Sequence, residues 1–373
     1  MIKEFVSEEM VINMGPQHPS THGVLRLEVK LDGEIVKEVI PHIGYLHRCF
    51  EKHTEALTYP QIVPYVDRMD YLAAMYNEFG FALAVERMAG IEVPPRVEYM
   101  RVILGELQRI ASHLVAVGTY GLDVGAFTPF LFCFRDREKI LSLFELVSGA
   151  RLLYNYIWPG GLSKEIHPDF VRLTKEFLVY FKPKLTELNR LLTGNKIFID
   201  RTANLGVLDI EKAINYGVTG PNLRASGYKW DLRRDDPYSI YDKFDFEIPV
   251  GDGAMGTTGD CWDRYYIRVR EMEESIKIIE QAIDNIPDGD VKSAIPKRIK
   301  VPAGQLYTRV ENPRGELGYF IISKGANNPF RVKVRPPSFI HLMLLDELCR
   351  GNLVADIVAI LGSIDIVLGE VDR

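Results

Sequence analysis

The stretch PPRVEYMRVILGELQRIASHL, residues 94–114, decides the fold class of this 373-residue chain. Pro94 and Pro95 are typical of the first turn of an α-helix, where a missing backbone N–H costs little. Apolar side chains then recur at helical spacing, namely Leu104, Leu107, Ala111 and Leu114. They form one stripe that must face a core. The sequence therefore predicts a long helix over 94–117, with the charged or polar side chains on its other, exposed surface: Arg101, Glu106, Arg109 and His113.

The same periodicity continues on both sides of this helix. Long helical segments are expected at 64–89, 129–157 and 167–192, and another runs from about 263 to 286. Long helices that follow one another through short connections are typical of a helical bundle.

Both ends of the chain contain strand patterns. In VLRLEVKL, residues 24–31, apolar and charged side chains alternate, and Asp32-Gly33 supplies a turn before the chain returns over 34–40. Near the C-terminus, 305–323 and 328–337 read as a small antiparallel sheet with a turn at 312–315. Two last helical or buried segments begin at Ser338 and Leu353. The predicted fold class is therefore α+β and predominantly α-helical.

This pattern divides the chain into regions that together form one continuous structural unit. We expect an N-terminal β-sheet region over 1–44, a central helical bundle over 45–300, and a C-terminal β/α region over 301–373 that packs back on the bundle. No internal repeat or low-complexity tract separates them.

Composition excludes several classes of function. A net charge of -6 is not the excess of positive charge that is typical of nucleic-acid-binding proteins. No signal-peptide pattern opens the sequence, and the most apolar segment, 353–369, is interrupted by Asp356 and Asp365. Any membrane role is therefore expected to come through partners. The four cysteines, Cys49, Cys133, Cys261 and Cys349, form no CxxC pair, so we expect reduced, mostly buried thiols and no metal bound by this chain.

The segment GPQHPSTHG, residues 15–23, contains two histidines at the spacing of a helical metal pair. Pro16 and Pro19 disfavour a helix there, so the segment is expected to be a loop leading into the first strand. Its hydroxyl side chains, Ser20 and Thr21, favour local turns. Two interpretations remain for the histidines: loop structure, or an imidazole presented at a loop tip and able to give a proton.

Two acidic motifs are ambiguous when read from the residues alone. In DRMDYL, Asp67 and Asp70 come at the start of the expected helix over 64–89, where the helix dipole favours acids. In LDVGAF, Asp123 follows the next expected helix in an apolar loop, and a carboxylate there needs a partner such as His22. Neither motif identifies a reaction.

Taken together, the motifs resemble a known family. They are GPQHPSTHGVLRL (15–27), HIGYLHR (42–48), DRMDYL (67–72), LDVGAFTPF (122–130), VSGAR (147–151), ASGYKWDLR (225–233), GDCWDRY (259–265) and GSIDIVLGEVDR (362–373). Over nearly its whole length the chain resembles the subunit known as D of respiratory complex I, the NADH–quinone oxidoreductase. This family is similar in fold to the large subunit of nickel–iron hydrogenases, which implies a hydrogenase-like helical bundle with flanking sheets.

The hydrogenase chemistry itself is not expected. Asp70 and Ala73 stand where the first metal-binding CxxC of hydrogenases would be, and Val367 and Glu370 stand where the second would be. Nickel in such a site prefers thiolates, and no thiolate is left.

The resemblance implies quinone chemistry instead. Tyr71 matches a tyrosine that hydrogen-bonds the quinone head group, His22 matches a histidine beside it, and Asp123 matches the acidic partner of that histidine. Arg48 matches an arginine close to a [4Fe–4S] cluster that the neighbouring iron–sulfur subunit, known as B, carries. Reduction of a quinone consumes two protons, which a phenol and an imidazole are able to supply.

Further expectations about partners and location follow from the resemblance. The family member packs against the iron–sulfur subunit, against the subunit known as C and against the membrane-arm subunit that holds the quinone channel, at the cytoplasmic side of the inner membrane. There it forms the quinone site of a proton-translocating oxidoreductase. The alternatives are a module fed by ferredoxin or another donor, and a scaffold without redox chemistry. The polar set formed by Tyr71, His22 and Asp123 disfavours the scaffold.

Two departures from the family pattern suggest a hypothesis. Leu153 stands where many relatives have a histidine near the cluster, and Trp158 stands where many have an arginine. Without a titrating imidazole, the cluster potential is expected to be lower and less dependent on pH, which suits a low-potential quinone such as menaquinone. The connection over 286–301 is also shorter than in longer relatives.

Overall fold

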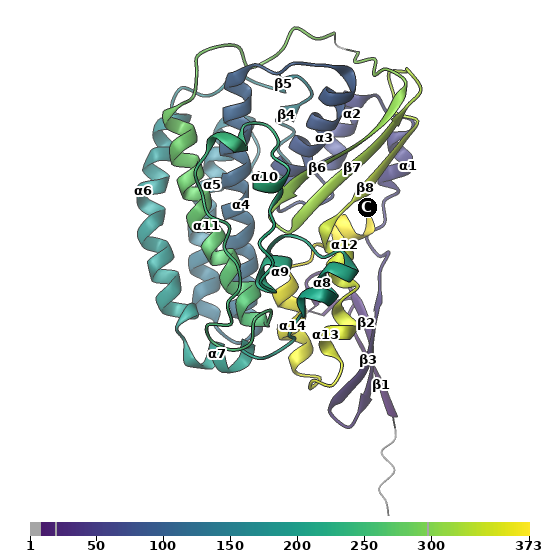
Figure 1. Cartoon of the computed structure of the whole chain (residues 1–373), viewed down its shortest axis with the longest axis vertical. Coiled ribbons are helices and arrows are strands. Elements are labelled where there is room, and N and C mark those ends of the chain that lie inside the picture. Colours follow the sequence, from purple (N-terminus) through teal and green to yellow (C-terminus); the bar gives the residue numbers. More distant parts are fainter. Residues whose placement is uncertain (1–8, 19–20, 297) are drawn as a thin grey trace, which may run out of the picture.

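A bundle of long helices occupies one side of the computed structural model, which describes residues 9–18, 21–296 and 298–373. Figure 1 shows its helices side by side: α4 (Pro95–Asp123), α5 (Phe127–Ser148), α6 (Phe170–Leu188) and α11 (Cys261–Asp284). α4 contacts α5 and α11, and α6 contacts the same two helices from the other side. The predicted bundle is confirmed.

The core-facing stripe of α4 is confirmed, but its expected exposed face is not. Leu104, Leu107 and Ala111 are fully buried. The charged and polar side chains predicted to lie on the surface are fully buried as well: Arg101, Glu106, Arg109 and His113. α4 is therefore covered on all sides, because other elements bring oppositely charged groups to its polar face.

Glu106 is the centre of that buried ionic network. It accepts hydrogen bonds from Arg109 at 3.1 Å, from Arg233 at 3.2 Å and from the Ser275 hydroxyl at 2.6 Å. Burial by itself would raise the pKa of Glu106, but the two guanidinium groups outweigh it and lower that pKa to about 2. A buried carboxylate is tolerated here because it is paired and hydrogen-bonded.

Glu106→Ala is expected to destabilise the fold by about 3–5 kcal/mol, because it removes a buried carboxylate that two buried guanidinium groups share. Urea unfolding of the purified chain at neutral pH measures the loss. Since the pKa of Glu106 is depressed, its stabilisation is present above pH ~4.5 and is lost as the pH falls through about 2. Glu280→Ala, which removes an exposed ion pair with Lys182, is the matched control and should cost under about 1 kcal/mol. Equal losses for both variants would contradict the prediction.

The expected helix over 64–89 is wrong as one element. The structure has α2 (Tyr59–Val66) and α3 (Ala74–Ala89), separated by turns. The carboxylates between them bind backbone groups instead of capping one continuous helix: Asp67 accepts the N–H of Asn155 at 2.9 Å, and Asp70 accepts the N–H of Leu72 at 3.1 Å. Tyr71 therefore lies in a turn and not on a helical face.

Other helix ends also differ from expectation. α4 continues to Asp123, six residues beyond its predicted end, because Gly118 lies close to Cys133 of α5 and this packing outweighs the low helix propensity of glycine. α5 ends at Ser148, where Gly149 adopts a left-handed conformation, so it does not reach 157. α6 ends at Leu188 and passes into a π-helical turn, Asn189–Thr193.

Both predicted sheets are present. β2 (Arg26–Asp32) pairs antiparallel with β3 (Ile35–His42), and its other edge pairs with β1 (Glu9–Met14), a strand that the alternation pattern did not predict. At the C-terminal end, β7 (Gly315–Ser323) lies between β6 (Gly304–Asn312) and β8 (Arg331–Arg335). Asn312 pairs with Gly315 at the predicted turn.

The remaining elements are short. They are α1 (Phe50–Thr54), β4 (Ile157–Trp158), β5 (Gly161–Leu162), α7 (Lys196–Thr202), α8 (Ile210–Tyr216), α9 (Gly220–Ala225), α10 (Leu232–Asp235), the 3-10 helix Tyr241–Lys243, α12 (Pro337–Leu342), α13 (Leu345–Cys349), α14 (Asp356–Ile364) and α15 (Leu368–Asp372). The segment 195–259 contains several of these short helices. The predicted C-terminal helical segments are confirmed.

Candidate functional site

The C-terminal segment 362–373 passes beside each of the residues that the sequence singled out. A Cβ added at Gly362 would lie 2.7 Å from Asp123 Oδ2, and one added at Gly369 would lie 3.3 Å from the Tyr71 ring. The carbonyl of Arg373 accepts the backbone N–H of Arg48 at 3.3 Å. Close packing against this segment therefore brings together side chains that are far apart in the sequence.

His22 and Asp123 form the pair that the sequence suggested. His22 Nε2 lies 2.6 Å from Asp123 Oδ2, and both side chains are largely buried. Asp123 is the last residue of α4 and does not lie in a loop as expected. The segment before His22 is a loop in its described part, and Thr21 donates to the carbonyl of His18 at 2.8 Å. Residues 19 and 20, including the expected turn residue Ser20, lie outside the described residues.

The environment of His22 favours the protonated imidazole. Burial by itself lowers the pKa of His22, but the hydrogen bond to Asp123 and the negative charges of Asp123 and Asp365 outweigh it, so the pKa is raised. With Nε2 directed at Asp123, Nδ1 is the nitrogen left to face a ligand. A histidine of this kind is able to give a proton and regain it.

Tyr71 lies in the turn before α3 and is partly buried. Burial and the neighbouring Asp70 raise the pKa of the phenol, and the positive charges of Arg314 and Arg48 oppose that rise. No protein hydrogen bond to the Tyr71 hydroxyl occurs within the described part of the chain. The phenol is therefore a proton-bearing group with its hydroxyl available to a ligand.

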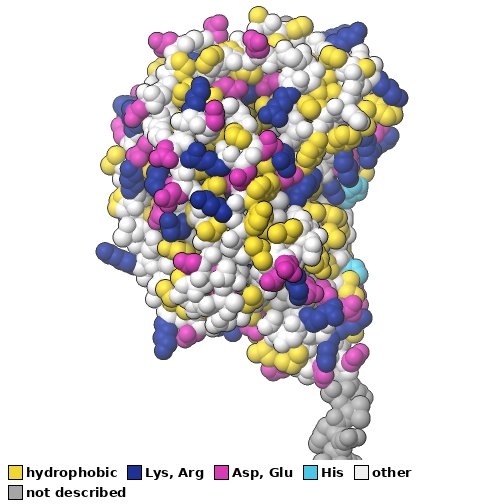
Figure 2. Space-filling model, viewed as in Figure 1, with side chains coloured by type: hydrophobic (Ala, Val, Ile, Leu, Met, Phe, Trp, Pro, Cys, Tyr) yellow, Lys and Arg dark blue, Asp and Glu magenta, His cyan; other side chains and the backbone are white. Residues whose placement is uncertain are grey.

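Arg48 lies at the exposed edge of the same region, just before α1. Its guanidinium donates to the carbonyl of Arg68 at 2.6 Å, in the turn that leads to Tyr71. Figure 2 shows further Lys and Arg side chains in the region of α1 and β8. These two elements contain Lys52, Arg331 and Lys333. These three cations are paired with Glu51 or Glu55, whereas Arg48 forms no ion pair within the described part of the chain.

Two of the four positions compared above with hydrogenase cysteines contain buried acids, Asp70 and Glu370. Asp70 is bound by Arg314 at 2.7 Å, and Glu370 Oε1 accepts the N–H of Ser338 at 3.0 Å. Burial and the nearby Asp70 raise the pKa of Glu370, and its Oε2 has no hydrogen-bond partner among the described residues. Within those residues, no group of three or more His, Cys, Asp and Glu side chains is arranged to hold a metal ion.

Sequence reasoning missed two residues of this region. Arg314 was seen only as part of a turn, and Asp365 only as a charge that interrupts an apolar segment. Both are buried and bound to each other. The sequence could have indicated them, because a charged side chain within an otherwise apolar segment requires a partner when it is buried.

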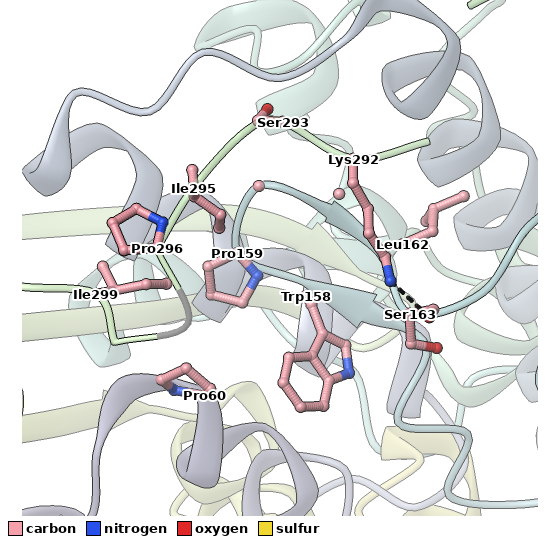
Figure 3. A pocket seen from close by; sticks show the side chains of 12 residues that line it. Pro60, Trp158, Pro159, Leu162, Ser163, Lys292, Ser293, Ile295, Pro296 and Ile299 are labelled. Atoms are coloured by element: carbon pink, nitrogen blue, oxygen red, sulfur yellow. Dashed lines mark hydrogen bonds between the residues drawn. The ribbon is translucent and has the colours of Figure 1, made fainter. Parts of the chain in front are cut away.

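A separate cavity of about 460 Å³ lies on another part of the surface, and Figure 3 shows it lined by Pro60, Trp158, Pro159, Ile295 and Ile299. The short connection between α11 and β6 forms one of its walls. The side chain of Lys292 donates to the carbonyl of Ser163 at 2.9 Å at one end. None of the four predicted site residues lines this cavity.

Of the cysteines, Cys133, Cys261 and Cys349 are buried and Cys49 is exposed, and all are free thiols, as expected. Over the described ranges, the structure contains no helix with the length and apolar character that crossing a membrane requires.

Comparison with known proteins identifies the family of this chain. Residues 123–299 and 293–373 match the family described as "Respiratory-chain NADH dehydrogenase, 49 Kd subunit". The NADH-quinone oxidoreductase subunit known as D of Chlorobium luteolum is 58% identical over 375 aligned positions, which cover 100% of this chain and 95% of that protein. The corresponding subunit of Cytophaga hutchinsonii, known as D 1, is 59% identical, with 98% of this chain and 96% of that protein covered.

The fold is a helical bundle with flanking antiparallel sheets, and the relatives are subunits of NADH-quinone oxidoreductase. Together they identify this chain as a subunit of an oxidoreductase complex. The chain belongs to the family of the 49 Kd subunit, also known as D, of complex I. The resemblance seen in its motifs is confirmed.

Proposed function

We propose that this chain is the peripheral-arm subunit that forms the quinone head-group site of a proton-translocating NADH:quinone oxidoreductase. It forms the site together with the iron–sulfur subunit, and it also contacts the subunit known as C and the membrane-arm subunit that holds the quinone channel. It acts at the cytoplasmic face of the inner membrane. The single observation that carries this proposal is the His22–Asp123 pair, joined to Tyr71 by the C-terminal segment.

The proposed chemistry needs two protons and two electrons for each quinone. A [4Fe–4S] cluster in the iron–sulfur subunit would supply the two electrons, one at a time. The Tyr71 O–H donates to one quinone carbonyl and the Nδ1–H of protonated His22 donates to the other, which gives the hydroquinone. Asp123 holds the imidazole through Nε2 and stabilises its positive charge. Proton uptake from solvent then restores both donors, and this uptake is the step that couples reduction to the pump.

Arg48 is proposed to lie beside the cluster of the iron–sulfur subunit. Arg48 is exposed and forms no ion pair among the described residues, so its positive charge is available to a partner that carries a negatively charged cluster. A fixed positive charge there favours the reduced cluster.

The test uses the assembled complex with Tyr71→Phe and His22→Ala. We expect quinone reduction to fall strongly in both, while reduction of the cluster by the upstream donor, followed by electron paramagnetic resonance, continues. Undiminished quinone reduction in both assembled variants would refute the proposal. Replacement of NADH by reduced ferredoxin as donor in the same assay distinguishes an NADH-fed complex from a differently fed one.

Leu153→His is expected to make the midpoint potential of the partner's cluster depend more steeply on pH, toward about 59 mV per pH unit, because an imidazole would take up a proton with each electron. A shallow slope in the unaltered complex would agree with the proposed use of a low-potential quinone such as menaquinone. A redox titration between pH 6 and pH 9 measures both slopes. Val179→His, at an exposed position of α6, is the control and should leave the slope unchanged. A steep slope without any substitution would contradict the hypothesis.

A further inference from the structure

Arg314 occupies the centre of the candidate site. It lies in the turn between β6 and β7, and the turn directs its side chain into the interior, where it is fully buried. Its Nη1 donates to Asp70 Oδ2 at 2.7 Å and to the Ser112 hydroxyl at 3.1 Å. Its Nε donates to the carbonyl of Asp365 at 3.0 Å, and its Nη2 to Asp365 Oδ1 at 3.3 Å.

The contacts of Arg314 connect the part of the site around Tyr71 with the part around His22 and Asp123. Asp70 directly precedes Tyr71, so the bond to Arg314 fixes the turn that carries the phenol. Asp365 follows the end of α14, whose Gly362 lies against Asp123, the partner of His22. The Arg314 guanidinium is thus bound to Asp70, the neighbour of Tyr71 in the sequence, and to the segment that packs on Asp123, the partner of His22.

We propose that Arg314 is a positioning residue for quinone reduction: it fixes Tyr71 and the His22–Asp123 pair relative to each other and supplies the positive charge that stabilises the phenolate left when Tyr71 gives its proton. This inference rests on the proposed function of Tyr71 and His22. It assigns a role to a residue that does not itself touch the quinone.

The surrounding charges support this role. The groups that act on Tyr71 are Asp70, Arg48 and Arg314, and those that act on His22 are Asp123 and Asp365. Asp365 is held by Arg314 and lies 3.6 Å from Arg268, while Asp365 Oδ2 has no hydrogen-bond partner in the described part of the chain. Glu370 adds a further acid near Arg314. Without Arg314, Tyr71 would lose one of the two positive charges that favour its phenolate.

The test is a double-mutant cycle in the assembled complex. Arg314→Gln is expected to lower kcat for quinone reduction by about tenfold with little change in KM, since Arg314 acts on the proton donor and not on quinone binding. In a Tyr71→Phe background the same substitution should lower kcat by less than about twofold, because the phenol through which it acts is gone. Arg314→Lys, which keeps the charge, should recover part of the loss, and Ser112→Ala, which removes one hydrogen bond and no charge, should have little effect.

A second variant tests the His22 side and does not depend on Arg314→Gln assembling. Asp365→Asn removes a negative charge that acts on His22, so the high-pH decline of activity should move to lower pH. An equal loss of kcat from Arg314→Gln in both backgrounds, or an unmoved pH profile in Asp365→Asn, would overturn the proposal. Full activity of Tyr71→Phe would instead overturn the proposed function on which it rests.

Discussion

Tyr71→Phe is expected to lower the rate of quinone reduction by the assembled complex by ~10²–10⁴-fold, the contribution typical of a general acid. The substitution removes one oxygen and leaves the ring, which packs against Gly369, in place. Because the Tyr71 hydroxyl has no hydrogen-bond partner among the described residues, its loss leaves no protein group unpaired. The fold is therefore expected to keep its stability while the proton donor is lost.

Steady-state reduction of a water-soluble quinone measures this effect, with kcat and KM determined separately. A fall in kcat indicates a lost proton donor, and a rise in KM alone indicates a lost binding contact. Tyr180→Phe is the matched control, since it removes a phenol of α6 that donates to Asp136 of α5 at 2.7 Å, away from the site. If Tyr71→Phe and Tyr180→Phe give the same activity, Tyr71 has no role as a proton donor.

His22→Ala is expected to cause a loss of similar size, ~10²–10⁴-fold, and Asp123→Asn a smaller loss that depends on pH. Asp123 raises the pKa of His22, so the imidazole stays protonated to higher pH than it otherwise would. With asparagine at this position, the proton is lost at lower pH. Asp123→Asn should therefore approach normal activity at acidic pH and lose most of it as the pH rises.

The pH profile of quinone reduction between pH 5 and pH 9 distinguishes these outcomes. His42→Ala serves as control, because His42 lies 3.2 Å from Glu28 in a comparable imidazole–carboxylate pair on the surface of the β2–β3 sheet. It should leave the profile unchanged. A uniform loss at every pH in Asp123→Asn would show that the carboxylate acts on structure and not on the protonation of His22.

The four predicted site residues show how much of a functional site can be predicted from the sequence. Their identities came from the family resemblance of short motifs, and the residue types agree with proton transfer. The sequence suggested that His22 and Asp123 are partners, but their contact geometry could not be predicted, because they are separated by 101 positions and meet only after the chain has folded. The helix pattern even misplaced Tyr71, since a turn held by tertiary hydrogen bonds interrupts the periodicity at 67–73.

The sequence by itself determined the elements whose signal is local. The apolar stripe of α4 specified a helix that packs on a core, and the alternating strands with turns at Asp32-Gly33 and at 312–315 specified the antiparallel hairpins. Such patterns act over a few residues, where backbone geometry fixes which side chains share a face. Only the tertiary structure decided which charged side chains are buried and which are exposed. Whether Glu106 or Arg314 lies at the surface or in the core depends on partners that are tens to hundreds of residues away, because a buried charge is stable only where an opposite charge meets it.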